Sequence, residues 1–143
     1  AALTSDAMNG LILPATRNTP SIFFEPASGR FEFSGVSIPE NASEYYQPVF
    51  EWLAINLAHL PDGSTFEFRL AYFNSTSLKA IFQILKQIKE ATVAGQRIAV
   101  RWFVEEGDEF MVESAEMFEQ LLDMRFEKVQ MDENNDTGQR QAG

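Results

Sequence analysis

The chain has 143 residues, of which 45% are hydrophobic and 13% aromatic, and this is enough apolar material for the core of one domain. Its 21 acidic residues against 11 Lys and Arg give a formal net charge of −10, an excess that repels phosphate backbones and argues against nucleic-acid binding. The absence of cysteine excludes disulfides and thiol catalysis and fits a cytoplasmic protein, and no stretch has the length and apolarity for membrane insertion or a signal peptide.

Composition divides the chain into three segments. Residues 1–17 show no sustained periodicity and are expected to form a flexible N-terminal arm, mobile or loosely docked. Residues 132–143 contain Ala142 as their only apolar residue, which predicts a disordered acidic and polar tail. The stretch between them, residues 18–131, carries the alternating and helical patterns of a single folded domain.

The first half of this domain is predicted to contain a hairpin and a helix. Ser21–Phe24 and Phe31–Ser34 are short runs rich in aromatic residues on either side of a Pro-to-Gly turn, a pattern typical of paired strands. Asn41 and Glu44 then have the spacing of a capping box, so a helix is expected from Asn41 to about Leu60. We expect this helix to bury one apolar face, made of Tyr45, Val49, Trp52, Leu53, Leu57 and Leu60.

The most informative stretch is a strand that leads directly into a helix. Phe66, Phe68 and Leu70 alternate with charged residues, which is the pattern of a half-buried strand. Apolar residues then recur at helical spacing opposite a polar face, namely Leu78, Ile81, Phe82, Leu85 and Ile88. Residues 74–77, one asparagine and three hydroxyl residues, lie between the two patterns, so hydroxyl groups are expected at the start of this helix.

The start of such a helix suits two chemical roles. The first backbone N–H groups have no partner within the helix, and the helix dipole adds partial positive charge, so a phosphate on a serine is stabilised there. Asn, Ser and Thr are also the preferred helix caps, so one of Asn74, Ser75 and Thr76 is expected to cap the helix. The two roles are compatible. Lys79 lies a few residues further on, on the polar face of the helix.

The remaining elements complete a predicted α/β domain with the order ββαβαβαβ. Ile98–Val104 alternates as a strand, a third helix begins in the acidic run Glu105–Glu109, and Phe126–Met131 forms the last strand. Strands joined by helices run parallel, whereas the hairpin is antiparallel, so the sheet is expected to be mixed. Charged residues along one strand face indicate that helices chiefly cover the other. The expected buried strand residues are Phe66, Phe68, Leu70, Val100 and Trp102.

The sequence shows no catalytic motif. His59, the single histidine, lies late in the first predicted helix without a nucleophile pattern around it. The carboxylates of Glu105–Glu109 suit a helix start, and they also suit a hard cation, but they lack the ligand spacing of an EF-hand loop. We therefore predict no metal and no other cofactor. A non-catalytic binding module is favoured, and a metal-dependent enzyme that uses this acidic loop is an alternative.

Several motifs occur together in an order that is fairly specific: Thr19–Ile22, Gly29–Phe31, Ser37–Asn41, Trp52, Leu70–Ala80 and Arg101-Trp102. In these residues the chain resembles the SiaC-type regulatory phosphoproteins, small bacterial proteins related in fold to the STAS anti-sigma-factor antagonists. The resemblance covers about residues 19–129. It implies a single STAS-like, or SpoIIAA-like, domain.

The same resemblance implies a partner switch in bacterial signalling. In the family, a dedicated serine/threonine kinase phosphorylates the hydroxyl residue directly after the motif asparagine, and a phosphatase reverses this. The unmodified protein binds and activates a diguanylate cyclase, which raises cyclic di-GMP and promotes biofilm formation. The matching position here is Ser75, with Thr76 as the runner-up. Asn74, Ser77 and Lys79 would belong to the turn and the partner-binding surface. An anti-sigma-factor antagonist is the alternative with the same fold.

Overall fold

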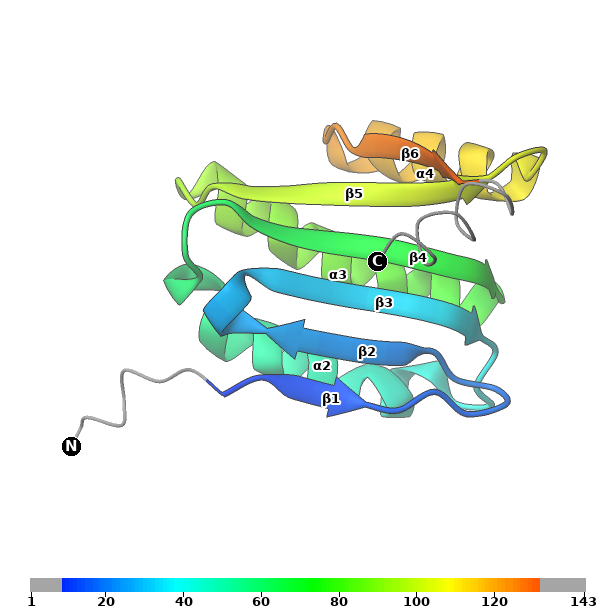
Figure 1. Ribbon diagram of the computed structural model, residues 1–143, viewed down its shortest axis with the longest axis horizontal. Coiled ribbons are helices and arrows are strands. Elements are labelled where there is room, and N and C mark those ends of the chain that lie inside the picture. The colour runs from blue at the N-terminus through cyan, green and yellow to red at the C-terminus, as the bar shows by residue number, and fades with distance from the viewer. Residues whose placement is uncertain (1–8, 132–143) are drawn as a thin grey trace, which may run out of the picture.

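The computed structural model describes residues 9–131, which form a six-stranded sheet with three long helices against one side (Figure 1). The strands are β1 (Leu11–Leu13), β2 (Ser21–Glu25), β3 (Arg30–Ser37), β4 (Ser64–Phe73), β5 (Ile98–Glu105) and β6 (Glu127–Met131). The helices are α2 (Ala42–Asn56), α3 (Ser75–Val93) and α4 (Glu109–Leu122), with short 3-10 helices at Pro26–Ser28 and Leu57–His59. The expected tail, residues 132–143, lies outside the described residues.

Strand order in the sheet follows the order of the chain, from β1 to β6. The first three strands pair antiparallel, and β3 to β6 pair parallel. Each parallel step crosses over through one helix, and because such crossovers are right-handed and all proceed in one direction, the three helices lie on the same face (Figure 1). The predicted mixed sheet with helices on one face is confirmed. No helix within residues 9–131 has the length and apolarity needed to cross a membrane.

Strand β1 lies where the sequence predicts a flexible arm. Leu11–Leu13 pairs with β2, and the indole N–H of Trp52 donates to the carbonyl oxygen of Asn9 at 2.9 Å, so this segment also contacts α2. Gly10 permits the close approach, because a Cβ atom there would overlap with the carbonyl oxygen of Phe24. The observed element order therefore gains one strand at its start, while residues 1–8 lie outside the described part of the chain.

The core lies between the helices and the covered face of the sheet. The five strand residues predicted to be buried, Phe66, Phe68, Leu70, Val100 and Trp102, are all buried. Aromatic rings stack across neighbouring strands, with the Phe68 ring centroid 4.6 Å from that of Phe33 and 5.4 Å from that of Trp102. Such contacts add to the stabilisation that the central strands gain from apolar burial.

Helix α2 begins where the capping box predicts, but it buries a different tyrosine. The side-chain oxygen of Asn41 accepts from the backbone N–H of Glu44 at 3.1 Å. Tyr46 is fully buried, whereas Tyr45 is half-buried, so the assignment of Tyr45 to the buried face is corrected. Tyr46 lies three residues before Val49 and therefore shares its face of the helix.

A β-bulge in β4 sets the position of the loop that follows. The pairing with β3 passes from Leu70 directly to Tyr72, which leaves Ala71 as an extra residue. The alternation of buried and exposed side chains along β4 reverses at this point, so that Phe73 points into the core and Tyr72 is exposed. Without the bulge, strict alternation from Leu70 would turn Tyr72 inward.

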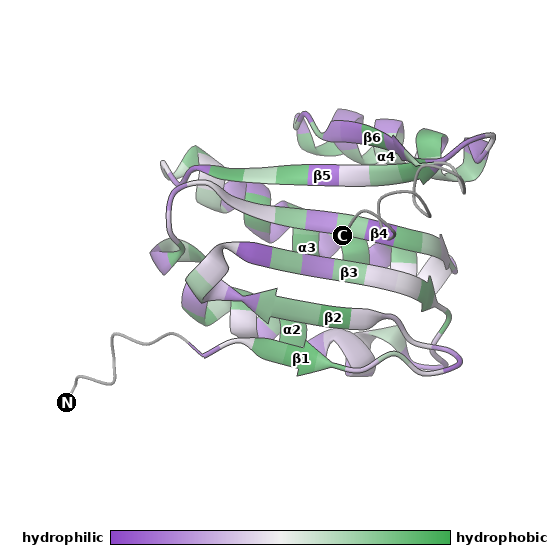
Figure 2. Ribbon diagram, viewed as in Figure 1, coloured by the Kyte–Doolittle hydropathy of each residue, from purple (hydrophilic) through white to green (hydrophobic). Residues whose placement is uncertain are grey.

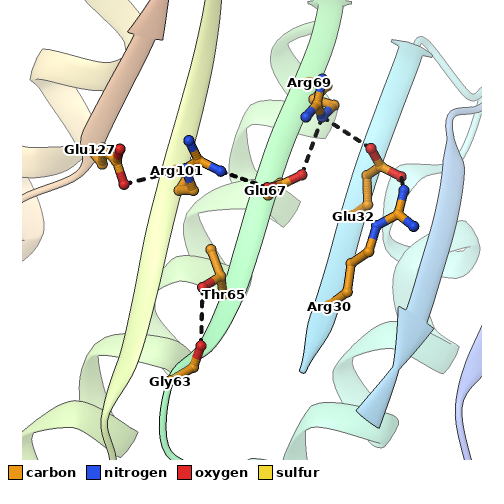
Figure 3. Close-up of polar contacts among 8 residues, drawn as sticks. All are labelled: Arg30, Glu32, Gly63, Thr65, Glu67, Arg69, Arg101 and Glu127. Carbon is orange, nitrogen blue, oxygen red and sulfur yellow. Dashed lines mark hydrogen bonds and ion pairs between the residues drawn. The ribbon is translucent and has the colours of Figure 1, made fainter. Parts of the chain in front are cut away.

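The uncovered face of the sheet carries a ladder of ion pairs across β3, β4, β5 and β6 (Figure 3). In order across the sheet, the paired residues are Arg30, Glu32, Arg69, Glu67, Arg101 and Glu127, with N–O distances of 3.0–3.2 Å. Phe103 lies on this face and is only 5% exposed, because the guanidinium of Arg69 covers its ring at 3.8 Å from the centroid. The ladder thus shields apolar surface on a face that has no helix layer.

Candidate functional site

Asn74 caps α3 and shapes the turn between β4 and this helix. Its side-chain oxygen accepts hydrogen bonds from the backbone N–H of Ser77 at 2.9 Å and from the hydroxyl of Thr76 at 3.1 Å. Its own backbone N–H donates to the carbonyl oxygen of Ser37 at 3.0 Å. Of the three candidates for the cap, the structure therefore selects Asn74, which is among the residue types preferred at this position.

The three hydroxyl residues after Asn74 have different surroundings. Ser75 is the first residue of α3 and is exposed, and its hydroxyl forms no hydrogen bond within residues 9–131. Thr76 is also exposed, but its hydroxyl is bonded to the Asn74 side chain. Ser77 is fully buried. Of the two exposed hydroxyl groups, that of Ser75 is thus the one without a hydrogen bond in the described structure, and the cap of the helix does not depend on it.

A buried hydroxyl cluster holds the start of α3 against β3 and α2. The hydroxyl of Ser37 lies 2.7 Å from that of Tyr46 and 2.8 Å from that of Ser77, and Ser77 also donates to the Ser37 carbonyl at 3.0 Å. One assignment of the hydrogens satisfies all three groups, with Tyr46 donating to Ser37, Ser37 to Ser77, and Ser77 to the carbonyl. Burial raises the pKa of Tyr46 above its ordinary value, and the bond to Ser37 offsets part of that rise.

Sequence patterns alone do not predict this buried cluster. Ser37 and Ser77 lie 40 residues apart in the chain, so no local pattern connects them. The spacing of Tyr46 and Val49 could have identified the buried tyrosine, but the spacing of Tyr45 and Val49, on which the prediction was based, fits one helix face equally well.

A groove of about 350 Å³ lies beside the turn, between the starts of α2 and α3. Phe50 and Ala80 contribute apolar surface to it, while Thr76 and Lys79 contribute polar groups. Lys79 is exposed, as its helical phase predicted, and it forms no ion pair in the described part of the chain. Of the predicted site residues, Thr76 and Lys79 line this surface hollow, whereas Ser77 is fully buried and does not form part of the surface.

The acidic loop after β5 lies at the start of α4. Asp108 caps this helix, because its carboxylate accepts from the backbone N–H of Met111 at 3.1 Å. Glu105, Glu106 and Glu109 are exposed. Within residues 9–131, no group of three His, Asp or Glu side chains is placed to hold a metal ion. The described structure therefore gives no support to the metal-dependent alternative.

Fold and site together define a class of protein: a small α/β domain that presents an accessible hydroxyl at a helix start, beside a surface groove. A model of the SiaC family regulatory phosphoproteins matches residues 13–131. The chain belongs to this family, and the resemblance inferred from its motifs is confirmed.

Individual relatives come from Pseudomonas aeruginosa. A protein of strain UCBPP-PA14, described as uncharacterized, is 34% identical over 111 residues, which cover 78% of this chain and 88% of the relative. The crystal structure of apo-SiaC matches with a TM-score of 0.74 and 31% identity, over 87% of this chain and 99% of that chain. A chain in the crystal structure of the diguanylate cyclase SiaD in complex with its activator SiaC matches with a TM-score of 0.75 and 32% identity, over 85% of this chain and 98% of that chain.

Proposed function

We propose that this protein binds and activates a diguanylate cyclase, and that a serine/threonine kinase and a phosphatase control this binding through Ser75. The main support for this proposal is the similarity of 85% of this chain to SiaC in the crystal structure of its complex with the cyclase SiaD. Cyclase activation raises cyclic di-GMP, so we place the protein in cytoplasmic signalling that promotes biofilm formation. The protein itself is a regulator with no catalytic step of its own.

Three features support Ser75 as the phosphoacceptor. Its hydroxyl is exposed, whereas that of Ser77 is buried and that of Thr76 is bonded to Asn74. Because Asn74 supplies the cap, modification of Ser75 leaves the turn intact. The free backbone N–H groups at the start of α3 also stabilise a phosphate at this position.

Phosphorylation at Ser75 acts directly on the binding surface. A phosphate adds about 1.5–2 negative charges at pH 7. A partner surface that fits the neutral hydroxyl then loses contact, because a phosphate buried against that surface would have to give up its water. The switch requires no rearrangement of the fold.

The test combines phosphate mapping with an activity assay. The wild-type protein and the Ser75→Ala and Thr76→Ala variants are incubated with the cognate kinase, and the phosphate is located by mass spectrometry. We expect one phosphate on the wild type and on Thr76→Ala, and none on Ser75→Ala. Phosphate on Thr76 alone, or full labelling of Ser75→Ala, would reassign the acceptor.

The cyclase assay tests the activator role separately. Unmodified wild type and Ser75→Ala should both increase cyclic di-GMP synthesis by the purified cyclase of the same organism, and the kinase should abolish the effect of the wild type alone. A cyclase that responds to none of these proteins would refute the activator role. Recovery of an anti-sigma factor in co-purification would favour the alternative partner switch.

A further inference from the structure

Exposed apolar side chains gather at the edge of the sheet where β3 and β4 end, next to Ser75. Tyr72, Phe110 and Ile38 are 47%, 40% and 37% exposed. The Tyr72 and Phe110 rings lie 5.2 Å apart between centroids, and the Phe110 ring is 5.1 Å from the buried ring of Phe73. Ile38 directly follows the end of β3, whose last residue pairs with Phe73. We call Ile38, Tyr72 and Phe110 the edge patch.

The backbone of β4 holds the aromatic pair outward. The extra residue Ala71 reverses the alternation, so that Phe73 fills the core and Tyr72 points to solvent. Phe110 is held in place by its contact with Phe73. Aromatic side chains fixed in this way lose little conformational freedom on binding, and Tyr and Phe are enriched at the centres of protein interfaces.

The edge patch has an acidic border. Glu105, Glu106 and Glu109 are exposed in the segment that joins β5 to α4, and Glu109 precedes Phe110 directly. Figure 2 shows this hydrophilic loop at the end of β5, the strand that neighbours β4 in the sheet. An apolar centre with an acidic border is complementary to an apolar surface flanked by Lys or Arg.

We propose that the edge patch and its acidic border are the surface that docks onto the diguanylate cyclase, through a cyclase segment with an apolar anchor flanked by basic residues. This inference rests on the proposed function and specifies which surface performs it. It also gives Glu105, Glu106 and Glu109 a role beyond the favourable effect of negative charge at the start of α4.

The position of Ser75 then explains how a phosphate releases a basic partner. The acidic border attracts basic residues over long range, so one more negative charge there would strengthen attraction. Ser75 lies two residues after Phe73, beside the apolar centre and not in the border. A phosphate there would have to lose its water against an apolar surface, which is costly in free energy. Phosphorylation should therefore still prevent binding at high salt, although salt screens the attraction between the acidic border and the basic residues of the partner.

The binding experiment measures the affinity of the unmodified protein for the purified cyclase by calorimetry. Phe110→Ser and Tyr72→Ser should each weaken binding at least about tenfold, as expected for anchors at the centre of an interface. Leu121→Ser is the matched control, because Leu121 lies near the other end of α4 and is 64% exposed. It should bind like the wild type. Thermal unfolding of each variant checks that it is folded.

A kinetic experiment tests the acidic border. The triple variant Glu105→Gln, Glu106→Gln, Glu109→Gln should slow association and reduce its dependence on salt, with little change in dissociation. The phosphorylated wild type should fail to bind at low and high salt alike. Recovery of its binding at high salt would refute the desolvation argument.

The outcomes separate this inference from the proposed function. If the unmodified wild type does not bind the cyclase, the proposed function fails and the surface assignment fails with it. If the wild type binds and both aromatic variants bind equally well, the surface assignment alone is refuted. A dimer of the free protein that Phe110→Ser disperses would assign the edge patch to a second copy of the chain instead.

Discussion

Replacing Ser37 with alanine should destabilise the protein more than replacing Tyr46 with phenylalanine, although both changes remove one oxygen atom from the same cluster. Ser37 lies between the other two hydroxyl groups, 2.7 Å from that of Tyr46 and 2.8 Å from that of Ser77. All three residues are fully buried. A group that loses its partner here is cut off from bulk water, so the two substitutions have unequal consequences.

The magnitudes follow from what each change leaves behind. In Tyr46→Phe, Ser37 still bonds to Ser77, so the loss is about 0.5–1.5 kcal/mol, the net value of one hydrogen bond. In Ser37→Ala, the Tyr46 hydroxyl is buried without its acceptor, which costs about 1–3 kcal/mol. In the double variant that hydroxyl is absent. Adding Tyr46→Phe to Ser37→Ala should therefore cost no further stability. The cost of the double variant should thus be smaller than the sum of the two single costs by at least about 0.5 kcal/mol, which is the coupling energy between the two residues.

Urea unfolding of the wild type, the two single variants and the double variant measures these differences. The midpoints should shift while the dependence of the free energy on urea stays constant, which shows that the folded and unfolded states are otherwise unchanged. Equal losses in the two single variants, with their sum in the double variant, would refute the view that these hydroxyl groups act as one network.

Three further changes test the fold and the turn. Phe68→Ala, at a ring stacked between two others, should cost about 3–5 kcal/mol in thermal or urea unfolding, and a near-normal melting temperature would contradict the core assignment. Asn74→Ala should cost about 0.5–2 kcal/mol in the same assay and Ser75→Ala less, since Asn74 is the cap; the reverse ranking would place the cap at Ser75. Because burial raises the pKa of Tyr46 in the folded state, stability should be complete below about pH 10 and fall as pH rises above it. Denaturation at increasing alkaline pH should show a smaller fall for Tyr46→Phe.

Elements governed by one local rule were predictable from the sequence. The alternation around Phe68 identified a central strand and its buried face correctly. Asn41 caps α2 as its spacing from Glu44 predicted, and the choice of caps for α3 already included Asn74. In each case the deciding interaction spans only a few residues, so the pattern and its physical cause lie in the same window of sequence.

Features that depend on distant parts of the chain were not predictable in this way. Leu11–Leu13 is too short to show a period, and its place in the sheet depends on pairing with β2 and on the contact between Trp52 and Asn9. The exposure of Tyr72 depends on a bulge that interrupts a regular alternation. The edge patch itself joins residues from three separate segments, which only the sheet topology brings to one place.

The choice between Ser75 and Ser77 illustrates how the core determines the surface. Residues in a helix advance by about 100° each, so Ser75 and Ser77 point in directions about 200° apart. Ser77 is held inward by its bonds to Ser37, and therefore Ser75 must point outward. The accessible hydroxyl is thus selected by a cluster whose own members are fully buried. An exchange of Ser75 for threonine keeps this orientation and the hydroxyl, whereas any loss of the Ser37–Ser77 contact removes the restraint that presents it.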